Sequence, residues 1–379
     1  MFYIMSGETL LHHPFSETSV ATSAKLVEEL NTQGSLDFTL LNPPIQLGLR
    51  SPIEVYDDDG LRWRGRVLSV ENGFDGRKTY HCEGMLAALC DTILKPFSFR
   101  GRPDDSGNVN GLFHEFINRH NAQLSQWDAN DPRLFTLGIC SGPYAVHDPN
   151  NFIYRSSESA MTTWDAINSR LIDTLGGYIY LSGDDLNVIN YVSDFPTTSG
   201  QKIEFGENLI DLIQLDSADS VASHLYAYGA QYDEETSIPP REVEPGDPQT
   251  TGYLEWNGNR LFVSYSRSDC IDRWGDIYAT VVFDDITTAE NLSTAANNWL
   301  KNNLAEHVES IECNAADLAL IDVSIDKINV GNYVNVICEP LVLDTTMLCI
   351  RKETDLIEVS QTKISIGRPQ STLSGMVGG

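Results

Sequence analysis

Alternating apolar and polar residues dominate both ends of this 379-residue chain. Residues 328–339, INVGNYVNVICE, place apolar side chains at one parity and mostly polar side chains at the other. A period of two predicts a strand with one buried and one exposed face, here bent at Gly331. The apolar positions of this strand are Ile328, Val330, Val334, Val336 and Cys338.

Strand patterns also fill residues 1–98. The stretch 53–82 predicts a meander, in which Gly60 supplies the positive φ that a tight turn needs. An apolar run at 85–94, closed by Pro96, predicts a short helix. Within the meander, one strand face is formed by Leu61, Trp63, Gly65 and Val67, and the opposite face by Arg62, Arg64 and Arg66.

The pattern changes to helical spacing within residues 99–205. Apolar residues recur every three or four positions in 156–177, which predicts a helix capped by Ser157 or Ser159 and ended by Gly176. This segment is expected to be a compact α/β insert domain. Its other expected elements are a helix at 112–124 and a hairpin formed by 178–181 and 186–192.

Strand patterns resume in residues 206–370, interrupted by an expected helix at 286–304 with a Thr287–Glu290 capping box. A strand pair is expected at 311–322, and a Pro-rich acidic stretch at 233–252 is too polar to pack. The pattern also predicts two strands in 208–230, a final meander over 328–366 with a bulge between Val359 and Ile364, and a flexible tail at 371–379.

The order β-rich, α/β, β-rich defines a β-rich α+β protein with domains at 1–98, 99–205 and 206–370. Strands from 206–232 are expected to complete the first β domain, although the pattern also allows them to begin the second. The meanders 53–82 and 328–366 are expected to form the two β domains.

Charge narrows the classes of ligand. The chain has 54 acidic and 25 basic residues, for a formal net charge of -29. Tight binding of nucleic acid is disfavoured because phosphate recognition needs clustered Lys and Arg, and an anionic membrane surface is disfavoured for the same reason. No run reaches the roughly 20 apolar residues that a membrane span requires, so no membrane insertion is expected. The start of the chain lacks the pattern of a secretion signal.

Residue types that carry catalysis or bind metals are present but badly spaced. His12 and His13 are adjacent, so a strand would point them to opposite faces, and His81 adjoins Cys82 in the same way. A hydrogen bond to a neighbouring backbone group is expected for His120. The seven cysteines are scattered and odd in number, which favours reduced thiols. No catalytic, cofactor-binding or metal-binding residue is predicted, and the chain is not expected to be an enzyme.

Acidic pairs lie in or beside predicted turns, where a short carboxylate caps local N–H groups. A glycosidase would need two carboxylates that face each other across a sugar, which a sequence cannot exclude. Exposed tryptophans could bind sugar but more often fill cores or interfaces. The acidic pairs begin at Asp57, Asp104, Asp184 and Asp284, and the tryptophans are Trp127, Trp256 and Trp274.

Several segments, taken in order, resemble the hub proteins of phage tails, the baseplate hubs and tail-associated proteins of long-tailed phages, often from Gram-positive hosts. The resemblance covers nearly the whole chain, and the order and spacing of its segments are more specific than any one of them. The segments are 65–97 (GRVLSVENGFDGRKTYHCEGMLAALCDTILKPF), 116–124 (FINRHNAQL), 146–157 (VHDPNNFIYRSS), 175–181 (LGGYIYL), 205–212 (FGENLIDL), 274–300 and 328–340.

The resemblance implies a structural virion protein of the tail tip, assembled in the cytoplasm of the bacterial host. Two small β-barrels per subunit, with an α/β insert, would form a homotrimer with pseudo-sixfold symmetry. This hub would close or open the tail tube for passage of DNA, without specific DNA binding, and anchor tail-tip or receptor-binding proteins. The implied partners are the distal tail protein, tail tube proteins, the tape measure protein and tail-fibre proteins.

Many relatives of this kind carry a C-terminal cell-wall hydrolase. Because Gly379 follows the last meander closely, no such lytic domain is expected here. Two alternatives stay open at the level of sequence. One is a cell-wall-degrading or glycan-binding tail enzyme that uses 99–205 as its active module, and the other is the hub of a contractile injection particle.

Overall fold

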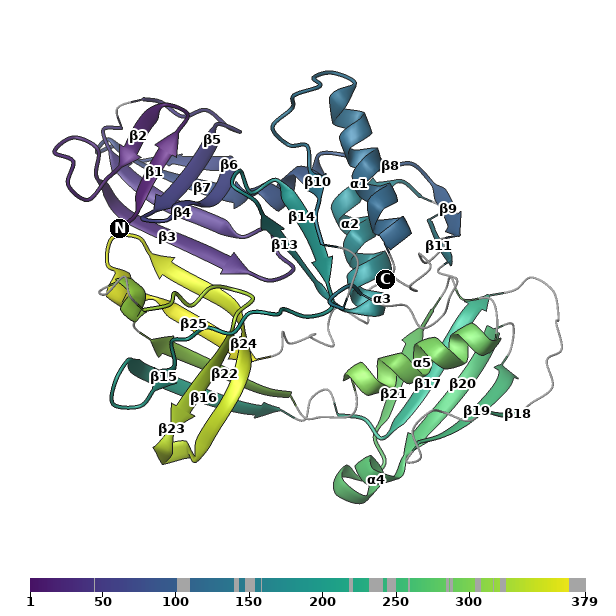
Figure 1. The fold of residues 1–379 in the computed structure, drawn as a ribbon. Coiled ribbons are helices and arrows are strands. Elements are labelled where there is room, and N and C mark those ends of the chain that lie inside the picture. Colours follow the sequence, from purple (N-terminus) through teal and green to yellow (C-terminus); the bar gives the residue numbers. More distant parts are fainter. Residues whose placement is uncertain are drawn as a thin grey trace.

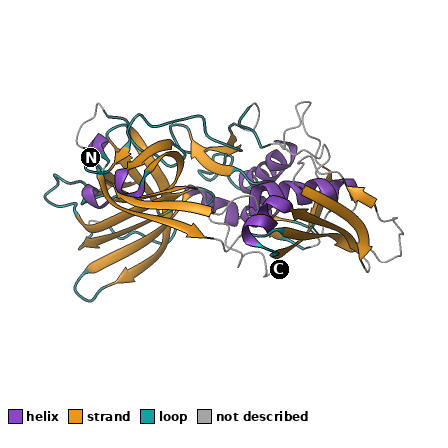
Figure 2. Ribbon diagram, turned by 90° about the horizontal axis from the view of Figure 1, so that it is seen from below, coloured by secondary structure: helices purple, strands orange, loops and turns teal. Residues whose placement is uncertain are grey.

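Four groups of elements make up the described chain in the computed structural model (Figure 1). N-terminal strands lie beside C-terminal strands, and two mixed α/β groups lie on the other side of the molecule, where the helices concentrate in Figure 2. The described residues are 1–43, 45–100, 110–139, 143–146, 154–157, 159–217, 221–231, 241–243, 250–257, 260–283, 286, 289–303, 308–315, 317–320 and 325–367.

The N-terminal group is an antiparallel sheet around one apolar core. Its strands are β1 (Tyr3–Ser6), β2 (Thr9–His12), β3 (Ala21–Glu29), β4 (Ser35–Leu41), β5 (Pro52–Asp57), β6 (Gly60–Asn72) and β7 (Arg77–Gly84). They pair in the order β3-β4-β7-β6-β5-β1-β2. The core includes fully buried Phe38 and Tyr80, whose rings stack with centroids 5.0 Å apart.

The C-terminal group continues the same sheet through one shared strand. Its strands are β15 (Ile203–Glu204), β16 (Leu209–Ser217), β22 (Val308–Ala315), β23 (Tyr333–Cys338), β24 (Leu343–Asp355) and β25 (Lys363–Gly367). β24 pairs with β23, β25 and β3, so it belongs to both β groups. β15 pairs with β23, and Phe205 forms a bridge with Leu209 at the start of β16.

The first mixed group lies between the β groups in sequence and packs its helices around its own core. Its helices are the 3-10 helix Met85–Cys90, α1 (Asn110–Ser125), α2 (Thr163–Ile167), a π-helical turn Asn168–Ile172 and α3 (Asp173–Leu175). Its strands are β8 (Ile93–Leu94), β9 (Phe97–Arg100), β10 (Thr136–Leu137), β11 (Tyr154–Ser157), β12 (Met161–Thr162), β13 (Tyr178–Ser182) and β14 (Val188–Val192).

The second mixed group is a five-stranded sheet with a separate core, to which α5 contributes buried Leu292 and Ala296. The strands pair in the order β18-β19-β20-β17-β21. The elements are β17 (His224–Gln231), β18 (Arg241–Val243), β19 (Thr250–Asn257), β20 (Arg260–Arg267), α4 (Ser268–Trp274), β21 (Tyr278–Val282) and α5 (Ala289–Asn303).

Many local expectations are confirmed. The meander in 53–82 forms β5, β6 and β7, and the hairpin after Gly176 forms β13 and β14. Buried Val334, Val336 and Cys338 alternate along β23, and Gly331 before it has a φ of +88°. Among the helices that the structure describes, none combines the length and apolarity that a bilayer crossing requires.

The helix expected at 156–177 begins later than predicted. Ser157 lies in β11, and the residue that caps α2 is Thr162, whose Oγ1 accepts a hydrogen bond from Asp165 N at 3.0 Å. Three other short segments form a different element from the one that the sequence predicts. The run 85–94 gives a 3-10 helix and β8, 318–320 forms a 3-10 turn instead of a strand, and the shift before Ile364 is the 3-10 turn Val359–Gln361.

The strands expected within 206–232 pair elsewhere than with the N-terminal group. β16 pairs with β22, and β17 pairs with β20 and β21. It is β24, from the end of the chain, that extends the N-terminal sheet. The proposed capping box lies outside the described residues at Thr287, and so does the tail 371–379. The loop 233–252 is described only at 241–243 and 250–252.

Candidate functional site

The row of arginines on β6 faces the rest of the molecule and joins its parts. Trp63, Gly65 and Val67 point into the N-terminal core, so the intervening Arg62, Arg64 and Arg66 share the outer face. The alternation in the sequence predicts this division, but it does not predict what the arginines contact. Each guanidinium reaches a different partner in another segment.

Arg62 connects the N-terminal strands with the C-terminal group. Its Nη2 donates to Glu28 Oε2 at 2.8 Å, and its Nη1 donates to Asn329 Oδ1 at 2.7 Å. Beside it, Lys327 Nζ lies 2.8 Å from Asp57 Oδ2 and 2.5 Å from Asp59 Oδ2. Residues 327–329, before β23, are therefore held against the β5–β6 turn by two cations. One is Arg62 on β6, and the other is Lys327 in the segment itself.

Asp91 is the acceptor at the junction with the first mixed group. It is the C-cap of the 3-10 helix Met85–Cys90, whose buried apolar side chains anchor the helix and so fix the position of Asp91. Arg50 Nη1 donates to Asp91 Oδ2 at 2.9 Å, and Arg133 Nη1 donates to the same oxygen at 3.0 Å. Arg66 forms two further hydrogen bonds with this carboxylate, one of them from Nη2 to Oδ1 at 3.0 Å.

The three arginines keep Asp91 ionised. Burial of this carboxylate, 9% exposed, opposes the charge, but hydrogen bonds from Arg66, Arg133 and Arg50 outweigh that effect and lower the pKa to about 2. The guanidiniums have other partners as well. Arg66 Nε donates to Glu83 Oε1 at 2.7 Å, and Arg133 Nη2 donates to Asp131 Oδ2 at 2.7 Å.

His120 on α1 contacts both segments that form the Asp91–Arg133 ion pair. One contact is with the backbone of Arg133, and the other is with the side chain of Thr92, which follows Asp91. Its Nε2 lies 3.0 Å from the Arg133 carbonyl oxygen, which can only accept, so Nε2 carries the proton. Its Nδ1 then accepts from the Thr92 hydroxyl at 2.7 Å. Burial lowers the pKa of His120 and favours this neutral form. The prediction that His120 forms a hydrogen bond with a neighbouring backbone group is confirmed. That backbone group belongs to Arg133, whose side chain binds Asp91 at the junction.

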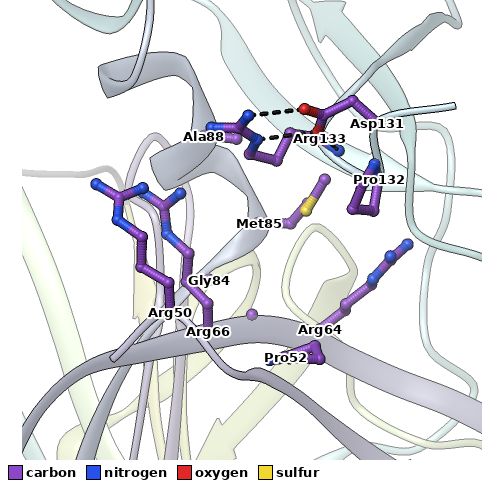
Figure 3. A pocket seen from close by; sticks show the side chains of 11 residues that line it. Arg50, Pro52, Arg64, Arg66, Gly84, Met85, Ala88, Asp131, Pro132 and Arg133 are labelled. Atoms are coloured by element: carbon purple, nitrogen blue, oxygen red, sulfur yellow. Dashed lines mark hydrogen bonds and ion pairs between the residues drawn. The ribbon is translucent and has the colours of Figure 1, made fainter. Parts of the chain in front are cut away.

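A pocket of about 440 Å³ opens between these groups (Figure 3). Met85 lies near its centre, Arg50 and Arg66 stand on one side, Arg64 stands opposite, and Arg133 lies above. The rest of the lining is Pro52, Gly65, Gly84, Ala88, Asp131 and Pro132. The pocket thus has an apolar lining between guanidinium groups that come from two parts of the fold.

Arg64 forms the weakest contacts of the three arginines on β6. Its Nη1 donates to the Asp185 carbonyl at 3.3 Å, and its Nε lies 3.9 Å from Glu54 Oε1, which is beyond hydrogen-bonding distance. The chemistry that this arrangement supports is recognition of an anion, because guanidiniums donate planar, charge-assisted hydrogen bonds.

Among the described residues, no group of three His, Cys, Asp or Glu side chains could hold a metal ion.

The histidines and tryptophans singled out in the sequence lie apart from this pocket's lining. His12 is buried and accepts a hydrogen bond from Ala21 N, and His81 Nδ1 lies 2.7 Å from Asp37 Oδ1. Trp127 is 90% exposed, and Arg273 stacks over the ring of Trp274. The side chain of Trp256 is outside the described residues.

Sequence reasoning missed Arg50, Asp91 and Arg133 as members of one site. The alternating arginines were a visible signal for one wall of it. Their partners carried no signal, because residues 50, 91 and 133 are separated by about 40 positions each and are brought together only by tertiary packing.

Comparison with known proteins agrees with the resemblance noted in the sequence. The model of the family described as prophage endopeptidase tail matches residues 198–376. No curated protein matches the chain. Three solved structures align over almost the entire chain, at identities that support a conclusion about the fold alone.

A prophage tail protein, gp18, from Listeria monocytogenes EGD-e has 13% identity and a TM-score of 0.58, with coverage of 99% of this chain and 96% of that one. The 43 kDa tail protein of prophage MuSo2 from Shewanella oneidensis has 14% identity and a TM-score of 0.62, covering 97% and 98%. A tail protein from Neisseria meningitidis MC58 has 13% identity and a TM-score of 0.64, covering 97% and 96%.

The chain therefore has the β-rich α+β fold of phage tail proteins. Its part from 198 to 376, which contains the C-terminal strands and the five-stranded sheet, matches the prophage endopeptidase tail family in sequence.

Proposed function

We propose that this protein is a structural component of a phage tail, a trimeric hub at the distal end of the tail tube. In this role it closes or opens the tube for passage of DNA and anchors tail-tip or receptor-binding proteins. The observation that carries the proposal is the likeness to three tail proteins over 97–99% of the chain. The family match over 198–376 supports it independently from sequence.

The two β groups are proposed as the ring-forming parts, a small β-barrel each. In the C-terminal group, the pairing of β15 with β23 and the Phe205–Leu209 bridge bring both ends of the strand set together. Closure of this strand set into a barrel would leave few free edges for unwanted pairing. Three copies would present six such units around one axis, and a cyclic arrangement closes its own interfaces.

The division into domains is part of the same proposal: 1–98 and 206–370 for the β units, 99–205 for the insert and 371–379 for a tail. The five-stranded sheet within 221–303 then forms a further small unit between the strands of the second β domain. The shared strand β24 and the Arg62 and Lys327 contacts support a rigid connection between the two β units.

The proposed partners are the distal tail protein, tail tube proteins, the tape measure protein and receptor-binding or tail-fibre proteins. DNA would pass without specific binding, because a chain with a net charge of -29 repels phosphates where its acidic residues line a bore. The proposed location is the virion tail tip, after assembly in the cytoplasm of the bacterial host.

Two experiments test this proposal at the level of the purified protein. Light scattering of the chain mixed with its tail tube protein should give complexes that contain three copies of the 42.1 kDa subunit. One copy, two copies or no complex with the tube would contradict the trimeric hub. Electron microscopy of the same sample should show a ring at one end of the tube.

A second candidate function is the enzymatic one that the sequence leaves open, although the match to the family described as prophage endopeptidase tail covers 198–376 and lies almost entirely outside the insert. A cell-wall-degrading or glycan-binding role would make the insert 99–205 the active module. Incubation with purified bacterial cell wall distinguishes the two roles. A structural hub releases no peptides or sugars, whereas an enzyme releases them at a rate proportional to the protein concentration.

A hub of a contractile injection particle remains the alternative within the structural class. Both kinds of particle would use a trimeric ring, so the subunit itself does not separate them. A sheath protein in the purified tail particles would support the contractile type, and its absence from complete particles would support the flexible type.

A further inference from the structure

The carboxylates around the arginine-lined pocket are already engaged, while the guanidiniums still have donors to offer. Asp91 accepts from three arginines, Glu83 accepts from Arg66, and Asp131 accepts from Arg133. An arginine carries five N–H donors. Within the described part of the chain, Arg50 uses only Nη1, and Arg64 makes one long hydrogen bond to a carbonyl and one ion pair at 3.9 Å with Glu54.

The two arginines with spare donors stand on opposite sides of the pocket (Figure 3). The Arg64 side chain is 20% exposed, and that of Arg50 is 64% exposed, so a group that enters from solvent meets Arg50 first. Met85, Pro52, Pro132 and Ala88 supply apolar surface between them. A ligand with an anionic head and a short apolar body matches this distribution.

The pocket volume limits the size of such a ligand. About 440 Å³ falls in the range of small-molecule sites and accommodates a side chain with its neighbouring backbone. A bare anion such as phosphate would leave the apolar lining uncovered. An acidic side chain on an extended peptide would cover that lining with its methylene groups and place a planar carboxylate against a planar guanidinium.

We propose that this pocket binds a carboxylate-bearing peptide segment of a partner protein, with Arg64 holding the carboxylate and Arg50, on the opposite and more exposed side, attracting the segment as it enters. Met85 contacts the apolar part of the peptide. The inference concerns the junction between the N-terminal strands and the insert, and it does not depend on a trimeric ring or on DNA passage.

The test uses blocked tripeptides and the intact chain with labelled methionine methyl groups. Acetyl-Ala-Glu-Ala-amide should shift the Met85 methyl signal in a saturable manner, with the signal assigned through the M85L variant. The isosteric acetyl-Ala-Gln-Ala-amide should bind at least about tenfold more weakly, the loss expected when a charge-assisted hydrogen bond is removed. Acetyl-Ala-Ala-Ala with a free C-terminus shows whether a chain end serves as well as a side chain.

Variants separate this site from general attraction of anions. R64Q should weaken binding of the Glu peptide about tenfold or more and R50Q should weaken it as well, whereas R77Q should leave it unchanged. Arg77 is the matched control because it pairs with Asp75 at the exposed start of β7 and is not part of the pocket lining. Thermal unfolding of each variant verifies that it is folded.

Several outcomes would overturn the proposal. These are an unchanged Met85 signal at saturating peptide, equal binding of the Glu and Gln peptides, and full affinity in R64Q. Equal or tighter binding of inorganic phosphate at the same methyl group would also overturn it, because that result identifies a site for small anions instead of a peptide. Failure of the trimer proposal would leave every one of these results unaffected.

Discussion

Lys352 on β24 and Asp317 form an ion pair inside the C-terminal β group. Lys352 Nζ lies 2.8 Å from Asp317 Oδ2, and the two side chains are 8% and 1% exposed. Nζ also donates to the Ile328 carbonyl at 2.7 Å, while Asp317 Oδ1 accepts from Gln201 Nε2 at 3.2 Å and from Ala319 N at 3.2 Å. The pair thus holds together segments that are far apart in sequence, and its lysine lies on the strand shared by both β groups.

Replacement of Lys352 by Met should destabilise the protein strongly. The substitution leaves the Asp317 carboxylate buried without its cation, a change that costs about 3–5 kcal/mol. Urea unfolding followed by circular dichroism measures this loss. The matched control is K363M, because Lys363 lies exposed on neighbouring β25 and should change the free energy of unfolding by less than about 0.5 kcal/mol. Equal effects of the two variants would disprove the role of the buried pair.

Replacement of Asp91 by Asn should loosen the junction between the N-terminal strands and the insert. The three arginines then face one another without the charge that unites them, and the loss of charge-assisted hydrogen bonds costs about 2–3 kcal/mol. The same denaturation experiment applies. D75N is the control, since Asp75 pairs with Arg77 at an exposed site where an ion pair contributes little. A D91N protein as stable as D75N contradicts the assignment.

Acid should remove the contribution of Asp91 to the stability of the junction. The pKa of this group falls from 3.8 to about 2 in the folded state, so its contribution is present above pH 3.8 and is lost as the pH falls toward 2. The difference in unfolding free energy between wild type and D91N should therefore shrink across that interval. A difference that stays constant between pH 5 and pH 2 would show that ionisation of Asp91 is not responsible.

Gly84 should tolerate no larger residue. A Cβ at this position would lie 2.0 Å from the Gln33 carbonyl oxygen and 3.3 Å from the indole nitrogen of Trp63, so Gly84→Ala forces backbone to move. Overpacking of this kind costs typically about 1–3 kcal/mol. G48A provides the comparison, because the nearest atom there is Ser51 Oγ at 3.9 Å. Similar melting temperatures of the two variants would refute the close packing at the end of β7.

Local patterns in the sequence were sufficient to predict individual elements. Alternation around Val334 and Val336 predicts β23 because a strand with one buried face must repeat every two residues. Glycine after Leu175 predicts the end of the helix because Gly176 adopts a φ of +73° there. The predicted start of that helix is too early by several residues. Thr162 is as good an N-cap residue as Ser157, and only tertiary packing selects it.

Partners that are distant in sequence could not be predicted. β24 pairs with β3 although more than 300 residues separate them, and no residue in either strand specifies that pairing by itself. The candidate pocket shows the same limit. The sequence predicts that Arg62, Arg64 and Arg66 share one strand face, but the convergence of Arg50 and Arg133 on Asp91 depends on how the insert docks.

Cryo-electron microscopy of assembled tail particles tests the central claim most directly. The account predicts three copies of this chain in a closed ring at the distal end of the tube, with the two β groups of each copy surrounding a bore that admits a DNA duplex. Density for the chain elsewhere on the particle, or a ring without a central bore, would contradict the account.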